Sequence, residues 1–124
     1  MLFVDNLCNI HITRGDTGKI LLGLSTGPKA CSADYVFSPT DKLNFCVYGV
    51  NERVPLFVIE FTNSDIVTIN EDTEHQYILI TLERDITRLP FREYQYDIKL
   101  YSIAEDNSIK VDTVVTRSML YIED

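Results

Sequence analysis

Apolar and polar residues alternate along most of this chain in short segments, and residues that favour turns separate the segments. Apolar side chains at every second position are typical of a β-strand that buries one face. Several such strands at close intervals favour an all-β fold, so the sequence predicts a β-sandwich of about seven to nine antiparallel strands. The expected strands are residues 9–13, 19–25, 43–50, 56–62, 66–69, 76–82, 94–103 and 109–119, with 120–122 continuing the last.

The alternation also predicts which side chains face the core. On the strand expected over 43–50, Leu43, Phe45 and Val47 should point inward. Cys46 and Tyr48 should point to the opposite, outward face of the same strand.

Two connecting segments depart from this strand pattern. Ile86 and Leu89 are three residues apart, so 83–89 is expected to form a single helical turn. Residues 26–41 contain prolines and a glycine and are expected to form a long loop. Within it, Tyr35-Val36-Phe37 is too apolar to remain in solvent, and we expect it to pack down as a short strand or against a neighbouring subunit.

A Leu89-Pro90 turn leads directly into the strand expected over 94–103. In β-sandwiches, a tyrosine near the start of such a strand forms a corner in which its hydroxyl bonds to the backbone. Tyr94 stands at this position, so the sequence predicts a tyrosine corner there.

Length and charge limit the possible functions. The chain has 124 residues, which fits one domain over 1–124. The net charge of −8 argues against nucleic acid and anionic membrane surfaces as partners, because both attract basic patches.

The three cysteines lack metal-like spacing, and the first residues do not resemble a signal peptide. We therefore expect free thiols and folding in a reducing cytosol.

Few residues in the sequence suggest a catalytic or binding role. Arg14-Gly15-Asp16 matches a tripeptide that adhesion receptors recognise, but Gly-Asp after a strand is ordinary turn chemistry. His11 is expected on a strand face, and His75 lies in an acidic stretch whose spacing fits no metal site. Cys8 and His11 would lie on opposite faces of a strand, which disfavours a nucleophilic pair. The sequence predicts no catalytic, cofactor-binding or metal-binding residues and no small-molecule substrate.

Four blocks carry a family resemblance, and they occur in order along nearly the whole chain. They are Ile10-His11-Ile12-Thr13-Arg14-Gly15-Asp16-Thr17, Asp41-Lys42-Leu43-Asn44-Phe45-Cys46-Val47, Leu89-Pro90 through Tyr94-Gln95-Tyr96-Asp97-Ile98-Lys99-Leu100, and Val111-Asp112-Thr113-Val114-Val115. The set resembles the N-terminal domains of phage baseplate upper proteins and related small prophage tail proteins of Gram-positive bacteria. Arg92 departs from the pattern, since the family usually has glycine there.

The resemblance implies an immunoglobulin-like sandwich that is a virion component with no enzymatic role. Its partners would be other tail or baseplate proteins, or further copies of itself. It would reside in the host cytoplasm during assembly and then in the virion.

The apolar segments outside the expected strands are the candidate contact residues. These are Leu2, Phe3 and Val4 near the start of the chain, and Tyr35, Val36 and Phe37 in the long loop. The alternative function is a carbohydrate-binding β-sandwich module. The absence of tryptophan weakens that alternative, and exposed coplanar tyrosine rings would strengthen it. An enzyme is the third and least favoured class.

Overall fold

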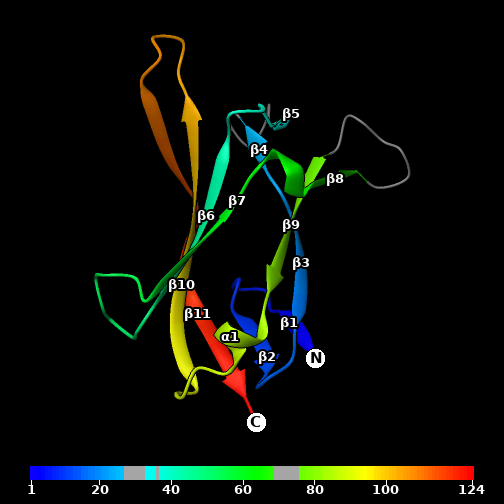
Figure 1. Cartoon of the computed structure of the whole chain (residues 1–124), viewed down its shortest axis with the longest axis vertical. Helices are drawn as coiled ribbons and strands as arrows, with labels where there is room; N and C mark the ends of the chain where they lie inside the picture. The colour runs from blue at the N-terminus through cyan, green and yellow to red at the C-terminus, as the bar shows by residue number, and fades with distance from the viewer. Residues whose placement is uncertain (27–32, 36, 69–75) are drawn as a thin grey trace.

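The computed structural model describes residues 1–26, 33–35, 37–68 and 76–124, and it confirms an all-β sandwich (Figure 1). The strands are β1 (Leu2–Val4), β2 (Ile10–Thr13), β3 (Gly18–Gly23), β4 (Ser25–Thr26), β5 (Ala33–Asp34), β6 (Lys42–Tyr48), β7 (Phe57–Phe61), β8 (Ile66–Thr68), β9 (Gln76–Leu82), β10 (Glu93–Ile103) and β11 (Ile109–Glu123). A 3-10 turn, η1 (Asn63–Asp65), precedes β8, and a short helix, α1 (Arg84–Thr87), follows β9.

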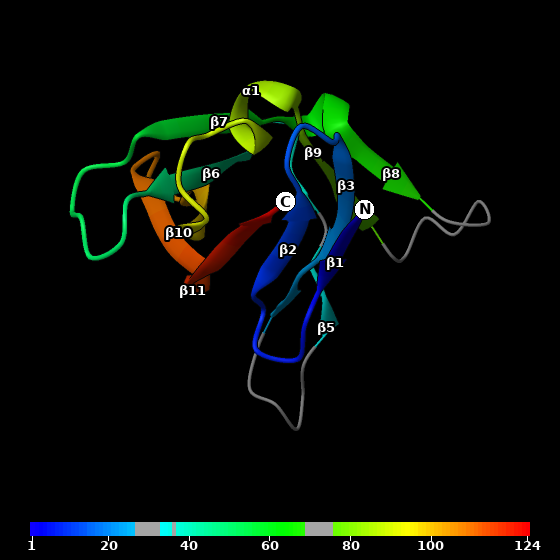
Figure 2. The same ribbon diagram turned by 90° about the horizontal axis from the view of Figure 1, so that it is seen from below.

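Two sheets face each other across the core. The larger has six strands in the order β1-β2-β11-β10-β6-β7, and the smaller has three in the order β3-β9-β8 (Figure 2). β4 and β5 form a separate two-stranded pair. All pairings are antiparallel except that of β2 with β11, which differs from the predicted uniform arrangement. Parallel strands need a crossover connection, and nearly the whole chain lies between these two.

The core consists of the inner faces of both sheets. Leu43, Phe45 and Val47 point inward as predicted, and the ring of Phe45 stacks on that of Tyr96 with centroids 5.1 Å apart. Among the described residues, the buried cluster comprises Ile10, Ile12, Phe37, Leu43, Phe45, Val47, Phe61, Ile78, Ile80, Leu82, Ile86, Tyr94, Tyr96, Ile98, Leu100, Leu120 and Ile122.

The predicted helical turn is present as α1. Ile86 is buried in the core and Leu89 packs against it, which is why their spacing of three signalled a helical turn. Thr87 is fully buried, and its hydroxyl donates a hydrogen bond to the carbonyl of Asp16 over 2.7 Å. α1 is thereby fixed to the turn that joins β2 to β3.

The predicted tyrosine corner also forms. Tyr94 is buried, and its hydroxyl accepts a hydrogen bond of 2.9 Å from the backbone N–H of Phe91. The turn before β10 is therefore held by the strand that follows it.

β10 and β11 form a long hairpin that extends beyond the sandwich (Figure 1). β11 continues through Glu123, so the predicted extension over 120–122 is part of this strand. The pairing shifts register on both sides of Ile98, between Tyr96 and Ile98 and between Ile98 and Lys99. Such bulges increase the local twist of a strand pair.

Short strands mark the main differences from the prediction. β1 pairs antiparallel with β2, although only apolar contact residues were expected there. β5 and Thr26 of β4 lie in the segment expected to be an irregular loop, whereas Ser25 of β4 is the last residue of the strand expected over 19–25. Each has only two or three residues, too few to show a period-two pattern.

Candidate functional site

The predicted contact residues near the start of the chain lie on β1, at one edge of the larger sheet. Leu2 packs against the core, whereas Phe3 and Val4 are exposed. The ring of Phe3 lies parallel to the imidazole of His11, with centroids 4.4 Å apart, and Tyr121 approaches the same imidazole at 4.9 Å. A contact role for Leu2, Phe3 and Val4 remains a prediction.

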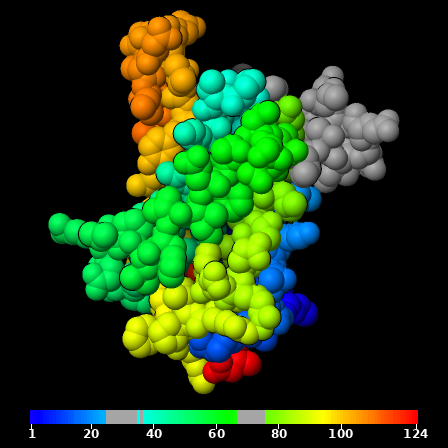
Figure 3. Space-filling model, viewed as in Figure 1, coloured from blue at the N-terminus to red at the C-terminus, as the bar shows by residue number. Residues whose placement is uncertain are grey.

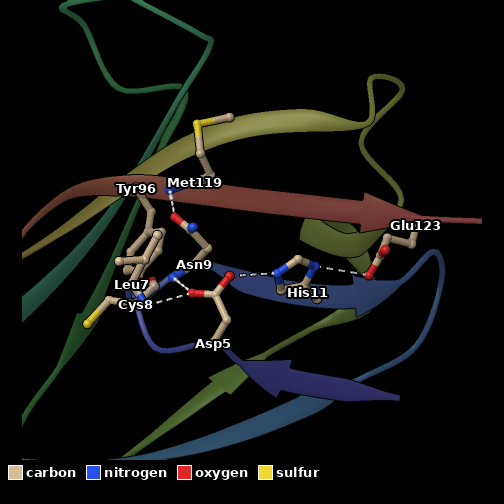
Figure 4. Close-up of polar contacts among 8 residues, drawn as sticks. All are labelled: Asp5, Leu7, Cys8, Asn9, His11, Tyr96, Met119 and Glu123. Carbon is tan, nitrogen blue, oxygen red and sulfur yellow. Dashed lines mark hydrogen bonds and ion pairs between the residues drawn. The ribbon is translucent and has the colours of Figure 1, made fainter.

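His11 also joins two acidic side chains (Figure 4). Its Nε2 donates to the Asp5 carboxylate over 3.0 Å, and its Nδ1 lies 3.4 Å from Oε1 of Glu123. The Asp5 carboxylate also accepts the backbone N–H groups of Leu7 and Asn9. The hydrogen bond from His11 is the main cause that lowers the pKa of Asp5 to about 2.

This cluster does not have the geometry of a metal site. The two carboxylates approach different nitrogens of the His11 ring, so the three groups do not converge on one ion. Among the described residues, no three His, Cys, Asp or Glu side chains are placed to hold a metal. His75 and its acidic neighbours lie outside the described residues.

The other predicted contact segment separates into differently placed residues. Phe37 is buried in the core, which corresponds to the expected packing-down of this segment, and its ring meets that of Tyr35 edge-on at 5.2 Å. The Tyr35 hydroxyl donates to the buried carboxylate of Asp41 over 2.6 Å. Burial, together with Asp41, raises the pKa of Tyr35. Val36 lies outside the described residues, and the contact role of this segment stays a prediction.

Cys8 and His11 show no thiol–imidazole contact. Cys8 is exposed and adopts a left-handed backbone with φ of 63°. Its carbonyl accepts a hydrogen bond from the hydroxyl of Tyr96 (Figure 4). His11 is instead held by Asp5 and Glu123. Cys8 therefore belongs to a structural turn.

Arg14, Gly15 and Asp16 form a turn that the rest of the fold holds in place. The Arg14 guanidinium donates to the carbonyls of Leu89 and Phe91 and pairs with Asp124 over 2.7 Å. Gly15 adopts φ of 82°, in the region that favours glycine. The turn interpretation is therefore confirmed, because the Arg14 side chain is engaged within its own domain.

Cys46 and Tyr48 lie on the outer face of β6, outside the core cluster, as predicted. Both are nevertheless covered there, with only 6% and 4% of their surface exposed. The Arg117 guanidinium lies 3.7 Å from the centroid of the Tyr48 ring and covers it. The Tyr48 hydroxyl donates to the buried carboxylate of Asp97 over 3.1 Å. Burial, and then Asp97, raise the pKa of the Cys46 thiol and raise the pKa of Tyr48 to about 12.

A larger exposed apolar area lies along β7 and the loop before it. We call it the β7 surface; its members are between 38% and 76% exposed and comprise Val50, Val54, Leu56, Phe57, Val58 and Phe91. Between the loop at 49–56 and residues 91–94 lies a groove of about 870 Å³. Figure 3 shows this part of the chain on the outside of the molecule, from the green loop to the yellow turn below it.

A second groove, of about 330 Å³, lies on the outer side of the larger sheet near the tip of the long hairpin. We call it the Tyr101 groove; its walls include Lys42, Asn44, Glu60 and Tyr101. The side-chain oxygen of Asn44 is buried without a hydrogen-bond partner. Lys42 and Glu60 form an exposed ion pair of 3.8 Å across it.

The predicted contact residues and the β7 surface occupy different parts of the molecule. The β7 surface was not predicted from the sequence, although the segment 56–62 offered a signal. Phe57, Ile59 and Phe61 alternate with Leu56 and Val58, so both faces of the strand are apolar. In a two-layer sandwich only one face of a strand packs against the opposite sheet, so the second apolar face has no place in the core.

Comparisons with protein-family models, with curated protein sequences and with solved structures returned no match. In the part of the chain that the structure describes, no helix is both long and apolar enough to cross a membrane.

Proposed function

We propose that this domain is a non-enzymatic structural subunit of a phage or prophage virion, in the tail or baseplate, that acts through protein–protein contacts. The observation that carries the proposal is the β7 surface, where six large apolar side chains are exposed: two on β7, three in the loop before it and Phe91 in the turn before β10. Large exposed apolar patches mark contact sites in folded proteins.

The sequence resemblance is the reason for proposing a virion protein in particular. The four blocks that resemble baseplate and tail proteins fall on structural parts of this domain. The first covers β2 and the Arg14 turn, the second covers β6, and the third covers the tyrosine corner and β10. The last falls in β11. Arg92, which replaces the usual glycine, pairs with Asp124 over 3.0 Å and is accommodated at the corner.

The test is mass spectrometry of phage particles purified after prophage induction in the source strain, together with the genes that flank this reading frame. We expect the chain in intact particles and tail or baseplate genes beside it. A host cytoplasmic protein of similar abundance serves as the control for carry-over. Absence from intact particles, with metabolic genes as neighbours, would contradict the proposal.

The Tyr101 groove supports a second candidate function, binding of a neutral carbohydrate. Sugar rings stack on aromatic side chains, and the groove places Tyr101 beside Asn44 and the Lys42–Glu60 pair. Titration with neutral oligosaccharides, followed by NMR, would shift the resonances of these residues. Tyr101→Ala should remove the response, and Tyr77→Ala on the other sheet should leave it unchanged.

A further inference from the structure

β7 is an edge strand without the features that usually protect such edges. It pairs with β6 on one side, and no described strand pairs with its other side. The segment 56–61 carries a single charge, Glu60, and no proline, and its pairing with β6 runs without a bulge. Natural edge strands are usually short, charged, bulged or covered, because open backbone groups recruit further strands.

The other edges of the two sheets are better protected. β1 has only three residues, and β8 has three in the part of the chain that the structure describes. β3 is longer, but it begins and ends with glycine and carries Lys19. Glycine weakens strand pairing, and lysine on an edge opposes it. β7 therefore stands out as the edge most suited to accept another strand.

We propose that β7 pairs with β7 of a second copy of this chain, and that the β7 surface forms the contact between the two. A two-fold axis between identical edge strands makes the pairing antiparallel. The larger sheet then continues from one copy into the other. In such a pairing, Glu60 lies opposite Glu60 of the other copy only in the register centred on this residue. In every other register the two like charges do not face each other.

Charge favours a second copy over a basic partner. The chain carries a net charge of −8, yet three acidic and three basic residues lie on and around the β7 surface. They are Glu52, Glu60, Glu93, Lys42, Arg53 and Arg92, all exposed. A locally balanced set can match itself across a two-fold axis, since acids of one copy can meet bases of the other. A strongly basic partner would instead select an acidic patch.

This inference rests on the proposed function in one respect: it names the partner that the same contact surface would bind. The test is the mass of the intact chain by size exclusion with light scattering across a wide concentration range. We expect the mass to rise from 14.3 kDa toward twice that value. A constant monomer mass at every concentration would overturn self-pairing, while the particle composition would still decide the virion role.

A pair of matched variants locates the contact. Val58 is 52% exposed on β7, and Val111 is 49% exposed on the long hairpin. Val58→Lys places a charge on the edge and should abolish the dimer, whereas Val111→Lys should leave it intact. Thermal melting followed by circular dichroism confirms that both variants fold. A dimer that survives Val58→Lys, or that Val111→Lys disrupts equally, would overturn the assignment to β7.

A further measurement applies to the unaltered chain and does not depend on any variant folding. Amide exchange in β7 should slow as the concentration rises, whereas exchange in β1 should not change. Exchange in β7 that is independent of concentration would overturn the proposal.

Discussion

The Asp5 carboxylate lies 3.0 Å from Nε2 of His11, and this contact closes the connection between β1 and β2. The same carboxylate accepts two backbone N–H groups in that connection. One ionised side chain thus organises the loop and holds β1 close to the sheet.

The charge of Asp5 should make stability depend on acid. Its pKa is lowered from 3.8 to about 2 in the fold, so its contribution is complete above about pH 4 and is lost as pH falls toward 2. Asp5→Asn keeps the shape and the acceptor oxygen but removes the charge. We expect this variant to be less stable than the wild type at neutral pH, with the difference vanishing near pH 2. Urea unfolding across this range would measure the difference.

An equal stability difference at pH 2 and pH 7 would contradict this account of Asp5. Asp106→Asn provides a control, since Asp106 accepts local hydrogen bonds from Ser108 in the exposed hairpin turn. Its pKa is also lowered, by these bonds and not by a histidine, so Asp106→Asn should show an acid-dependent stability difference of the same sign.

Gly15 should resist substitution for a purely backbone reason. It adopts φ of 82°, and an added Cβ would meet only Nε of Arg88, at 4.0 Å. Gly15→Ala should therefore cost about 1–2 kcal/mol of unfolding free energy from the left-handed backbone alone. Gly49→Ala is the matched control, because its Cβ would meet the flexible side chain of Glu52 and no positive φ is involved. Denaturant unfolding of both variants measures the difference, and an equal cost would refute the explanation.

Arg14 should be a structural residue whose loss weakens the corner before β10. Its side chain is 27% exposed and donates to the carbonyls of Leu89 and Phe91 as well as to Asp124. Arg14→Ala should lower the unfolding free energy by about 2 kcal/mol, since charged hydrogen bonds are lost. The exposed Arg53→Ala should change it by less than about 0.5 kcal/mol. Similar values for both variants would mean that the bonds to the corner contribute little.

The two described cysteines should react at very different rates. Cys8 is exposed, whereas Cys46 is buried and its thiol pKa is raised by burial and by Asp97. Each unit of pKa reduces the reactive thiolate about tenfold. In a Cys31→Ser background, a chromogenic disulfide reagent should modify one thiol quickly and the other only on unfolding. Cys8→Ser should remove the fast phase, and rapid reaction in that variant would contradict the burial of Cys46.

Local alternation predicted the parts of the fold in which one strand face meets the core. Leu43, Phe45 and Val47 are an example, because each neighbouring residue points to the other side of the sheet. The same rule placed Tyr48 correctly on the outer face, but it did not predict that the side chain is buried there, because Arg117 arrives from β11 and covers it. The alternation of residues within β6 contains no information about the contact between Arg117 and Tyr48.

The candidate site was harder to predict than the core. The N-terminal apolar residues proved to be a paired edge strand, and Phe37 proved to be a core residue. The β7 surface consists of residues from β7, the loop before it and the turn at Phe91. Its existence depends on which strand lies at the sheet edge, and the order of strands follows from the whole topology.

The parallel pairing of β2 with β11 determines how the domain would carry mechanical load. Ile10 pairs with Leu120 and Thr13 with Glu123, so the incoming and outgoing chain leave this pairing at opposite ends. Tension along the chain would first peel β1 from β2, one pair at a time. It would then load the β2–β11 hydrogen bonds together in shear, which resists force better than sequential unzipping. The β1–β2 pairing should therefore separate at low force, and the β2–β11 pairing should then resist until a higher force is reached.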